Sequence, residues 1–260
     1  MISAGLLLLQ TVGGRADPVL LYPVADTTLS ENWAANNLGG LPFINAGTTQ
    51  NFTTNRALLR FDLAGAIPAG SVITSVALTL EVTREPGDGY NLSDFGLHRV
   101  LRDWGEGDNV TPSGSTSPGS GAPADPGEAN WFHRFASTAN SWGIPGGEAD
   151  VDYASLPSAA ITIYGVGDSP YVFGSTPALV ADAQLWLDQP QRNFGWMLIS
   201  QSETLDFTAR RFGSREDPLN TPYLSVDFIS VPEPPAAALL LLGFIGAICG
   251  RRLRFGSLVF

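Results

Sequence analysis

The stretch VITSVALTLEV, at residues 72–82, alternates two kinds of side chain along its length. Every second residue is mostly apolar, and the residues between them are mostly smaller or polar. The apolar set contains Val72, Val76, Leu78, Leu80 and Val82. A period of two is typical of a β-strand that buries one face and exposes the other. We therefore predict a long, half-buried strand over these residues.

A second alternating run, RALLRFDL, precedes this strand at residues 56–63. The tripeptide Pro-Ala-Gly at residues 68–70 is a turn signal between the two strands. Further strands are expected near residues 18–23, 26–30, 95–101, 160–165, 194–200, 205–212 and 223–229. Many short strands separated by turns favour an all-β fold, and we predict a β-sandwich of the jelly-roll type.

One short helix is expected after residue 176. Thr176 can accept hydrogen bonds from the first turn, Pro177 suits the first helical position, and Pro190 ends the segment. The apolar residues of this segment recur at helical spacing, which gives it one buried face. They are Leu179, Val180, Ala183 and Leu187.

The composition limits the class of partner. The chain has 260 residues and a net charge of −11, and all of its basic residues except two histidines are arginines, with no lysine. An acidic chain without a basic stripe is not typical of nucleic-acid binding, so no nucleic acid is expected as a partner. The single cysteine, Cys249, lies in an apolar stretch near the end. No disulfide can therefore form inside the domain, which must be held by its core.

The sequence predicts a targeting segment at each end of the chain. Residues 1–16 contain a short apolar run and end in Gly-Arg-Ala, which suits a cleaved secretion signal, although no basic residue precedes the run. A buried N-terminal strand is the alternative. At the other end, residues 231–260 begin with Val231, Pro232, Glu233 and Pro234, continue with an apolar segment at 236–250, and carry Arg251 and Arg252 after it. That segment is about long enough for a transmembrane helix.

The C-terminal pattern resembles the PEP-CTERM sorting signal. The resemblance rests on Pro-Glu-Pro, the apolar segment and the arginines, and the chain departs from it by running on to Phe260. It implies an exosortase as a partner in a Gram-negative bacterium, a transient stay in the inner membrane, and a mature protein at the cell surface or in the extracellular matrix, beside exopolysaccharide. A simple tail anchor is the alternative.

The order of motifs over residues 17–230 resembles a DNRLRE domain. These motifs are Asp26-Thr27-Thr28-Leu29, the run at 56–63, Trp104-Gly105-Glu106-Gly107, Asn193-Phe194-Gly195-Trp196, and Phe212-Gly213-Ser214-Arg215-Glu216. The resemblance implies a jelly roll similar to carbohydrate-binding modules, in a secreted protein, without established catalytic residues. The chain departs from it by a Gly-, Ser- and Pro-rich stretch at 109–127, which we expect to be a mobile loop.

Two groups of residues are candidates for carbohydrate binding. Arg56 and Arg60 lie on the same face of one predicted strand, where a guanidinium group can bind a sugar carboxylate in two places. We favour the alternative that they pair with nearby carboxylates of the protein. Trp104, Trp131 and Trp142 lie in polar, glycine-rich surroundings, and exposed indole rings there would stack on sugars. Buried packing is the alternative that we favour for these three, and Trp186 and Trp196 are assigned to the core.

Asp103, Glu106 and Asp108 cluster in a glycine-rich segment and are candidate calcium ligands. A solvated acidic loop is the alternative that we favour. No established hydrolase or metal motif is present, and His98 and His133 are far apart in the sequence. The sequence therefore predicts a non-catalytic protein that binds extracellular polysaccharide. A structural matrix protein is the second hypothesis, and a lyase or glycosidase is the third, with His98, Tyr90 or Tyr153 as its base.

Overall fold

The computed structural model describes residues 18–230. The predicted secretion signal at 1–16 and the predicted sorting segment at 231–260 lie outside these residues. Among the residues that are described, no helix is both long and apolar enough to span a bilayer.

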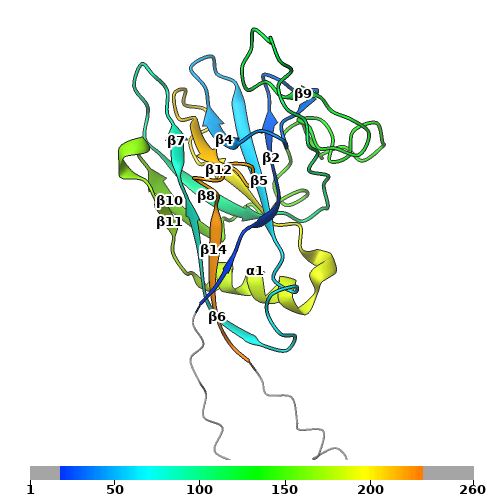
Figure 1. The fold of residues 1–260 in the computed structure, drawn as a ribbon, viewed down its shortest axis with the longest axis vertical. Coiled ribbons are helices and arrows are strands. Elements are labelled where there is room, and N and C mark those ends of the chain that lie inside the picture. Colours follow the sequence, from blue (N-terminus) through cyan, green and yellow to red (C-terminus); the bar gives the residue numbers. More distant parts are fainter. Residues whose placement is uncertain (1–17, 231–260) are drawn as a thin grey trace, which may run out of the picture. The chain divides into compact units, whose positions relative to one another are not determined.

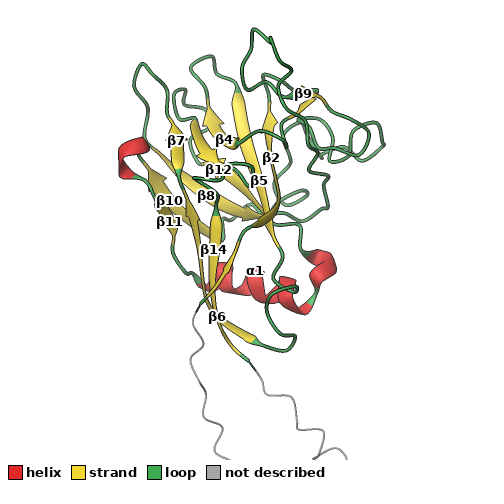
Figure 2. Ribbon diagram, viewed as in Figure 1, coloured by secondary structure: helices red, strands yellow, loops and turns green. Residues whose placement is uncertain are grey.

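The described part of the chain is mostly β, with antiparallel sheets and one short α-helix (Figure 2). Its strands are β1 (Val19–Leu21), β2 (Pro23–Ser30), β3 (Asn36–Asn37), β4 (Phe43–Thr48), β5 (Thr54–Phe61), β6 (Val72–Leu80), β7 (Val82–Arg84), β8 (Ser93–Arg99), β9 (Ala122–Pro123), β10 (Ala159–Ile163), β11 (Tyr171–Phe173), β12 (Trp196–Ser200), β13 (Arg210–Gly213) and β14 (Tyr223–Ile229). The helix α1 (Pro177–Asp188) is accompanied by two 3-10 turns, η1 (Val166–Asp168) and η2 (Pro190–Arg192).

Two sheets form the main body of the fold (Figure 1). The smaller sheet has the strand order β1-β14-β6-β11. The larger one has the order β10-β8-β12-β5-β4-β13-β7, with β2 also paired to β5, and it curls into a half-barrel. A short third ladder joins β3 to β9, and β9 lies inside the stretch at 109–127 that the sequence predicts to be a loop. Val19 pairs with Val226, so the chain enters and leaves the described part side by side.

The predicted strand at 72–82 is divided between the two sheets. β6 ends at Leu80 in the smaller sheet, and β7 begins at Val82 in the larger one, so the chain crosses between the sheets at Glu81. The alternation also breaks once, because the pairing with β14 shifts and leaves Thr74 without an opposite residue. As a result Ile73 is buried and Val72 is exposed, the reverse of the predicted faces at this end.

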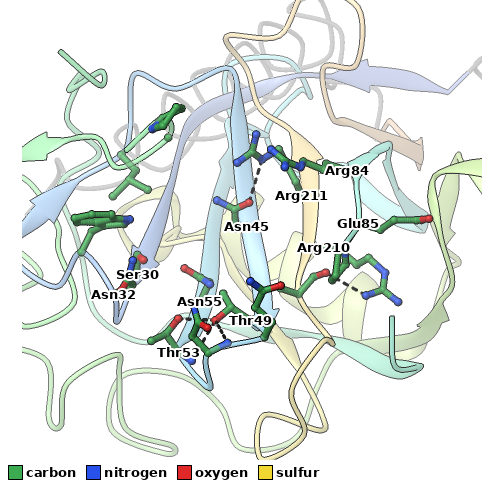
Figure 3. Close-up of a pocket in the computed structure, with 18 of the residues that line it drawn as sticks. Ser30, Asn32, Asn45, Thr49, Thr53, Asn55, Arg84, Glu85, Arg210 and Arg211 are labelled. Atoms are coloured by element: carbon green, nitrogen blue, oxygen red, sulfur yellow. Dashed lines mark hydrogen bonds between the residues drawn. The ribbon is translucent and has the colours of Figure 1, made fainter. Parts of the chain in front are cut away.

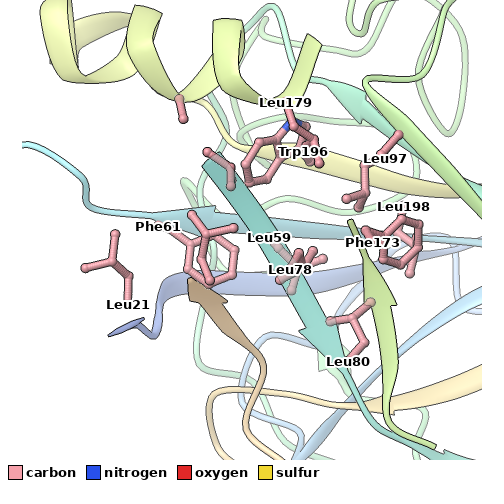
Figure 4. Packing of buried hydrophobic residues seen from close by; sticks show 14 of the residues in the cluster. Leu21, Leu59, Phe61, Leu78, Leu80, Leu97, Phe173, Leu179, Trp196 and Leu198 are labelled. Atoms are coloured by element: carbon pink, nitrogen blue, oxygen red, sulfur yellow. The ribbon is translucent and has the colours of Figure 1, made fainter. Parts of the chain in front are cut away.

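The main hydrophobic core lies between the two sheets and α1 (Figure 4). Leu59 and Phe61 of β5 point into it with Leu78 and Leu80 of β6, as the alternation predicts. α1 begins and ends as expected, and the hydroxyl of Thr176 accepts a hydrogen bond of 3.0 Å from the Leu179 N–H. The helix contributes Trp186, which meets Trp196 edge-on with 4.4 Å between ring centroids. Both tryptophans are buried, so their assignment to the core is confirmed.

The opposite face of β5 is covered by irregular chain instead of a third sheet. Leu58 points away from the main core, into a second apolar cluster with Val100, Met197 and three tryptophans. Most of the covering residues come from the segment between β8 and β10, in which β9 is the only named strand. A run of chain with so little regular structure still builds a core because Trp104, Trp131, Trp142 and Tyr153 all pack into the same cluster.

Candidate functional site

The two arginines predicted for carbohydrate binding are paired within the protein. Arg56 binds Glu203 through two hydrogen bonds of 2.8 and 2.7 Å, and it also donates to the carbonyl oxygens of Gly146 and Gly147. Arg60 contacts Asp103 at 3.2 Å and lies over the ring of Trp104. Pairing with carboxylates, the alternative that we favoured, is therefore what the side chains do. In this arrangement Arg56 holds the irregular segment around residue 146 against β5.

Trp104, Trp131 and Trp142 do not present exposed rings, so the carbohydrate-stacking role is wrong for them and the alternative that we favoured, buried packing, is confirmed. Their exposed fractions are 2, 9 and 4%. The indole N–H of Trp104 donates to the Phe194 carbonyl, and that of Trp142 donates to the Asn130 carbonyl. The glycine-rich surroundings that suggested a loop are a tightly packed covering layer, and these rings are its core. A buried indole cannot stack on a sugar.

Asp103, Glu106 and Asp108 do not converge on a common point either. Asp103 turns to Arg60, whereas Glu106 pairs with Arg215 at 2.7 Å. Throughout residues 18–230 no group of three or more histidine, cysteine, aspartate or glutamate side chains is arranged to hold a metal ion. The candidate calcium site is therefore not formed by these three residues, and the carboxylates of Asp103 and Glu106 each pair with a different arginine.

A polar cavity of about 360 Å³ lies elsewhere, on the larger sheet and its neighbouring turns (Figure 3). Its floor includes Asn45 of β4, Arg211 of β13 and Arg84 of β7. Its walls come from the turns after β2 and β4 and from Pro118 and Gly119 of the segment at 109–127. Further lining residues are polar, and they include Asn32, Gln50, Asn51, Thr53 and Asn55. We call this site the arginine cavity.

Strand register creates the floor of the arginine cavity. Arg211 is paired with Asn45 on one side and with Arg84 on the other, so all three side chains lie in one row on the outer face of the sheet. The neighbouring row, Ile44, Phe212 and Val82, is buried in the main core. Arg211 falls near the end of the strand predicted at 205–212, but no strand was predicted at 43–48, so the row could not be recognised.

Arg211 and Arg84 carry positive charge without an acidic partner. Across the described residues, no carboxylate forms an ion pair with either of them. The guanidinium group of Arg211 lies 3.5 Å from the centroid of the Phe43 ring, and its Nε donates a 3.4 Å hydrogen bond to Asn45. Burial, and then the charge of Arg84, lower the pKa of Arg211 to about 10, so the group is still a cation at neutral pH.

Glu85 lines the same cavity but does not neutralise the arginines. Its Oε2 accepts a hydrogen bond of 2.7 Å from the Val166 N–H, which turns the carboxylate toward η1. Figure 3 shows Arg84 and Arg211 close together above Asn45, with Glu85 directed away from them. The charge at the floor of the cavity is therefore positive, against the acidic balance of the whole chain.

Trp33 is the sixth tryptophan of the chain, and no role was predicted for it from the sequence. It is half-buried and lines the arginine cavity, whereas the other five are buried. Trp33 stands in the polar run Glu-Asn-Trp-Ala-Ala-Asn-Asn directly after β2. The sequence signal for a partly exposed ring was a tryptophan that follows a strand and stands among asparagines. Such a ring has few apolar neighbours in sequence that could bury it.

The candidate bases of a lyase, His98, Tyr153 and Tyr90, lie in three different settings outside the lining of the arginine cavity. His98 is buried, its ring nitrogens contact the Ala154 carbonyl and Gln201, and burial lowers its pKa. Tyr153 is buried against His98 and Arg56. Tyr90 lies 4.1 Å from the guanidinium carbon of Arg210, measured to its ring centroid. None of these three residues lines the arginine cavity.

Comparison of the chain with models of known protein families finds no matching family, and a search of curated proteins finds no match either. The two family resemblances therefore stay predictions that rest on the quoted residues. What the geometry supplies independently of them is one polar cavity with an aromatic wall and two cations on its floor.

Proposed function

We propose that this protein is an exported, non-catalytic surface or matrix protein that binds acidic polysaccharide in the arginine cavity. The observation that carries the proposal is the pair Arg84 and Arg211, which meet in a cavity without any carboxylate partner. Arg211 is half-buried, and a partly desolvated cation without a counter-charge is costly to maintain, so an anionic ligand would remove that cost. Arg84 is exposed and adds a second positive charge beside it.

The lining residues suit a sugar acid. A planar guanidinium group binds a carboxylate or sulfate through two parallel hydrogen bonds. The asparagine and glutamine side chains around it offer both donors and acceptors to sugar hydroxyl groups. Trp33 adds a partly exposed ring that can cover the apolar face of a pyranose. The arginine cavity therefore combines groups that can bind an anion, groups that can bind sugar hydroxyls, and a ring that can stack on a sugar.

The other described arginines support this assignment by contrast. Arg56, Arg60, Arg99, Arg102 and Arg215 each pair with a carboxylate of the protein. Arg134 and Arg210 donate to backbone carbonyl groups instead. Arg192 is exposed and makes only a 3.4 Å contact to Gln189. In a domain without lysine, arginine is thus used mainly to hold segments together. Arg84 and Arg211 have neither a carboxylate nor a backbone carbonyl partner among the described residues, and Arg211 only contacts Asn45 and lies over the Phe43 ring.

The proposal also covers the fold of the protein and its export from the cell. We infer a jelly-roll sandwich of the DNRLRE type, a cleaved secretion signal, and a PEP-CTERM tail that an exosortase processes at the inner membrane of a Gram-negative bacterium. The two antiparallel sheets around a common core agree with a sandwich. The sorting motif at residues 231–234 supports the destination, where polysaccharide is the abundant partner.

The test is affinity electrophoresis of the purified full-length protein through gels that contain alginate, pectin, cellulose or dextran. Retardation by alginate or pectin, and not by the neutral polymers, supports the proposal. The double variant Arg84→Gln and Arg211→Gln should run unretarded, while Arg192→Gln, at an exposed arginine outside the cavity, should behave like the unaltered protein. Equal mobility of the folded protein in every gel would instead favour a purely structural matrix protein.

A further inference from the structure

The turn between β4 and β5 holds an exposed phenylalanine at its tip. Phe52 is 66% exposed, and its immediate neighbours Asn51 and Thr53 both line the arginine cavity. Since consecutive Cα atoms are about 3.8 Å apart, the backbone of Phe52 lies directly beside the lining of that cavity, although its ring is not part of the lining.

The backbone of Phe52 adopts a conformation that its residue type disfavours. Its φ is 58°, in the left-handed region that glycine and asparagine enter most readily. The Phe52 N–H bonds the Thr49 carbonyl, and the Thr49 N–H bonds the Thr53 carbonyl, which closes a three-residue hairpin loop. The last residue of such a loop is normally a glycine, because the left-handed conformation is needed there.

Nothing in the fold explains a phenylalanine at this position. The hydroxyls of Thr49 and Thr53 bond each other at 2.7 Å and hold the turn without help from the ring. A second phenylalanine with positive φ, Phe207, is different: it is half-buried, and its carbonyl accepts hydrogen bonds from Asn91 and Arg210. Phe52 combines an unfavourable backbone with an exposed apolar ring, and both features weaken the folded state.

We propose that Phe52 is a ligand-contact residue that extends the arginine cavity by one stacking position for a polysaccharide chain. This inference rests on the proposed function and adds Phe52 to the proposed binding site. A polymer seated on Arg84 and Arg211 would pass the turn at 49–53, and the apolar face of the next sugar ring would cover the phenyl ring. Strained backbone is often retained where a side chain must be presented to a ligand.

The experiment compares binding and stability in one variant. Phe52→Gly should relieve the strained backbone and leave the melting temperature unchanged or raise it by about 2–4 °C. The same change should weaken alginate or pectin binding about five- to tenfold, because the stacking surface is lost. Phe52→Tyr, which keeps a ring, should retain the affinity of the unaltered protein.

Leu219→Gly is the matched control, since Leu219 is 88% exposed and does not line the cavity. It should leave the affinity unchanged. Undiminished binding by Phe52→Gly, or a clear fall in its melting temperature, would overturn the role of Phe52 while the proposed function stands. If the unaltered protein binds neither alginate nor pectin, both proposals fail together.

Discussion

The backbone N–H of Arg215 donates a 2.8 Å hydrogen bond to Oδ2 of Asp26, across 189 residues of sequence. Glu106 joins them, because its Oε1 accepts from the Asp26 N–H at 2.7 Å and contacts the Arg215 side chain at the same distance. Glu216 completes the group at 2.8 Å from Arg215. Three motifs that resemble a DNRLRE domain thus meet at one point, and their role there is to tie β2 to two distant loops.

Asp26 makes this group sensitive to pH. Its side chain is fully buried, Oδ1 has no hydrogen-bond partner, and burial raises the pKa of the carboxyl well above its ordinary range. A folded-state pKa above the unfolded one means that the native state holds the extra proton. The free energy of unfolding should therefore fall as the pH rises from about 4 toward the folded-state pKa.

Asp26→Asn isolates that contribution, because an amide resembles the protonated acid in shape and has no charge. We expect its unfolding free energy, measured by urea titration at several pH values, to fall less steeply with pH than that of the unaltered protein. The pKa of Glu106 is also raised, chiefly by burial, so some slope of the same sign will remain in the variant. Parallel pH profiles for the two proteins would show that Asp26 is already ionised in the native state.

Arg210 offers a second test of how the fold is held. It is 1% exposed and lies over Tyr90, and burial lowers its pKa. Its guanidinium group donates to the backbone carbonyls of Asn91, Ile163, Tyr164, Phe207, Thr208 and Ala209. A lysine keeps the charge but has only three donors, in a different geometry.

Arg210→Lys should therefore lower the unfolding free energy by about 2–3 kcal/mol, because several buried carbonyls lose their donors. Arg192→Lys, at an exposed position, should change it by less than about 0.5 kcal/mol. Thermal melts monitored by circular dichroism measure both. Equal stability of the two variants would mean that water replaces the lost donors at Arg210.

The helix and several strands of this fold could be predicted because their signals are local, whereas β4 and β11 were not predicted. The alternation at 56–63 identified the faces of β5, and Thr176 and Pro177 marked the start of α1. The exposure of the tryptophans could not be predicted in the same way. Whether Trp131 is buried depends on a segment without regular structure folding over the sheet, and composition alone made that segment look like a loop. Similarly, Asn45, Arg84 and Arg211 form a site only through strand register.

Substitutions of the buried tryptophans should affect stability, whereas substitution of Trp33 should affect polysaccharide binding. Trp104→Ala or Trp142→Ala removes a buried ring and should cost about 3–5 kcal/mol of unfolding free energy. Trp33→Ala, at the cavity wall, should cost much less and weaken polysaccharide binding about tenfold. Urea denaturation and affinity electrophoresis on the same preparations give both quantities. Normal binding by Trp33→Ala would remove that ring from the proposed site.

Salt dependence provides the most direct test of the two unpaired arginines. The chain has a net charge of −11, so an acidic polymer is repelled at long range and can be held only by local charge at the cavity floor. Such contacts weaken with ionic strength, because the screening length is about 10 Å at 0.1 M salt and about 3 Å at 1 M.

We therefore expect the contribution of the two cavity arginines to pectin affinity to fall between about 0.05 and about 0.5 M sodium chloride. Arg84→Gln and Arg211→Gln should each weaken binding at low salt about tenfold and flatten its salt dependence, since each removes one charge contact. Arg211→Gln should have the larger effect, because Arg211 is the more buried of the two and an ion pair in a less polar setting is screened less. Arg192→Gln serves as the control at an exposed site. Salt dependence that survives loss of both cavity arginines would place the anion contact elsewhere on the protein.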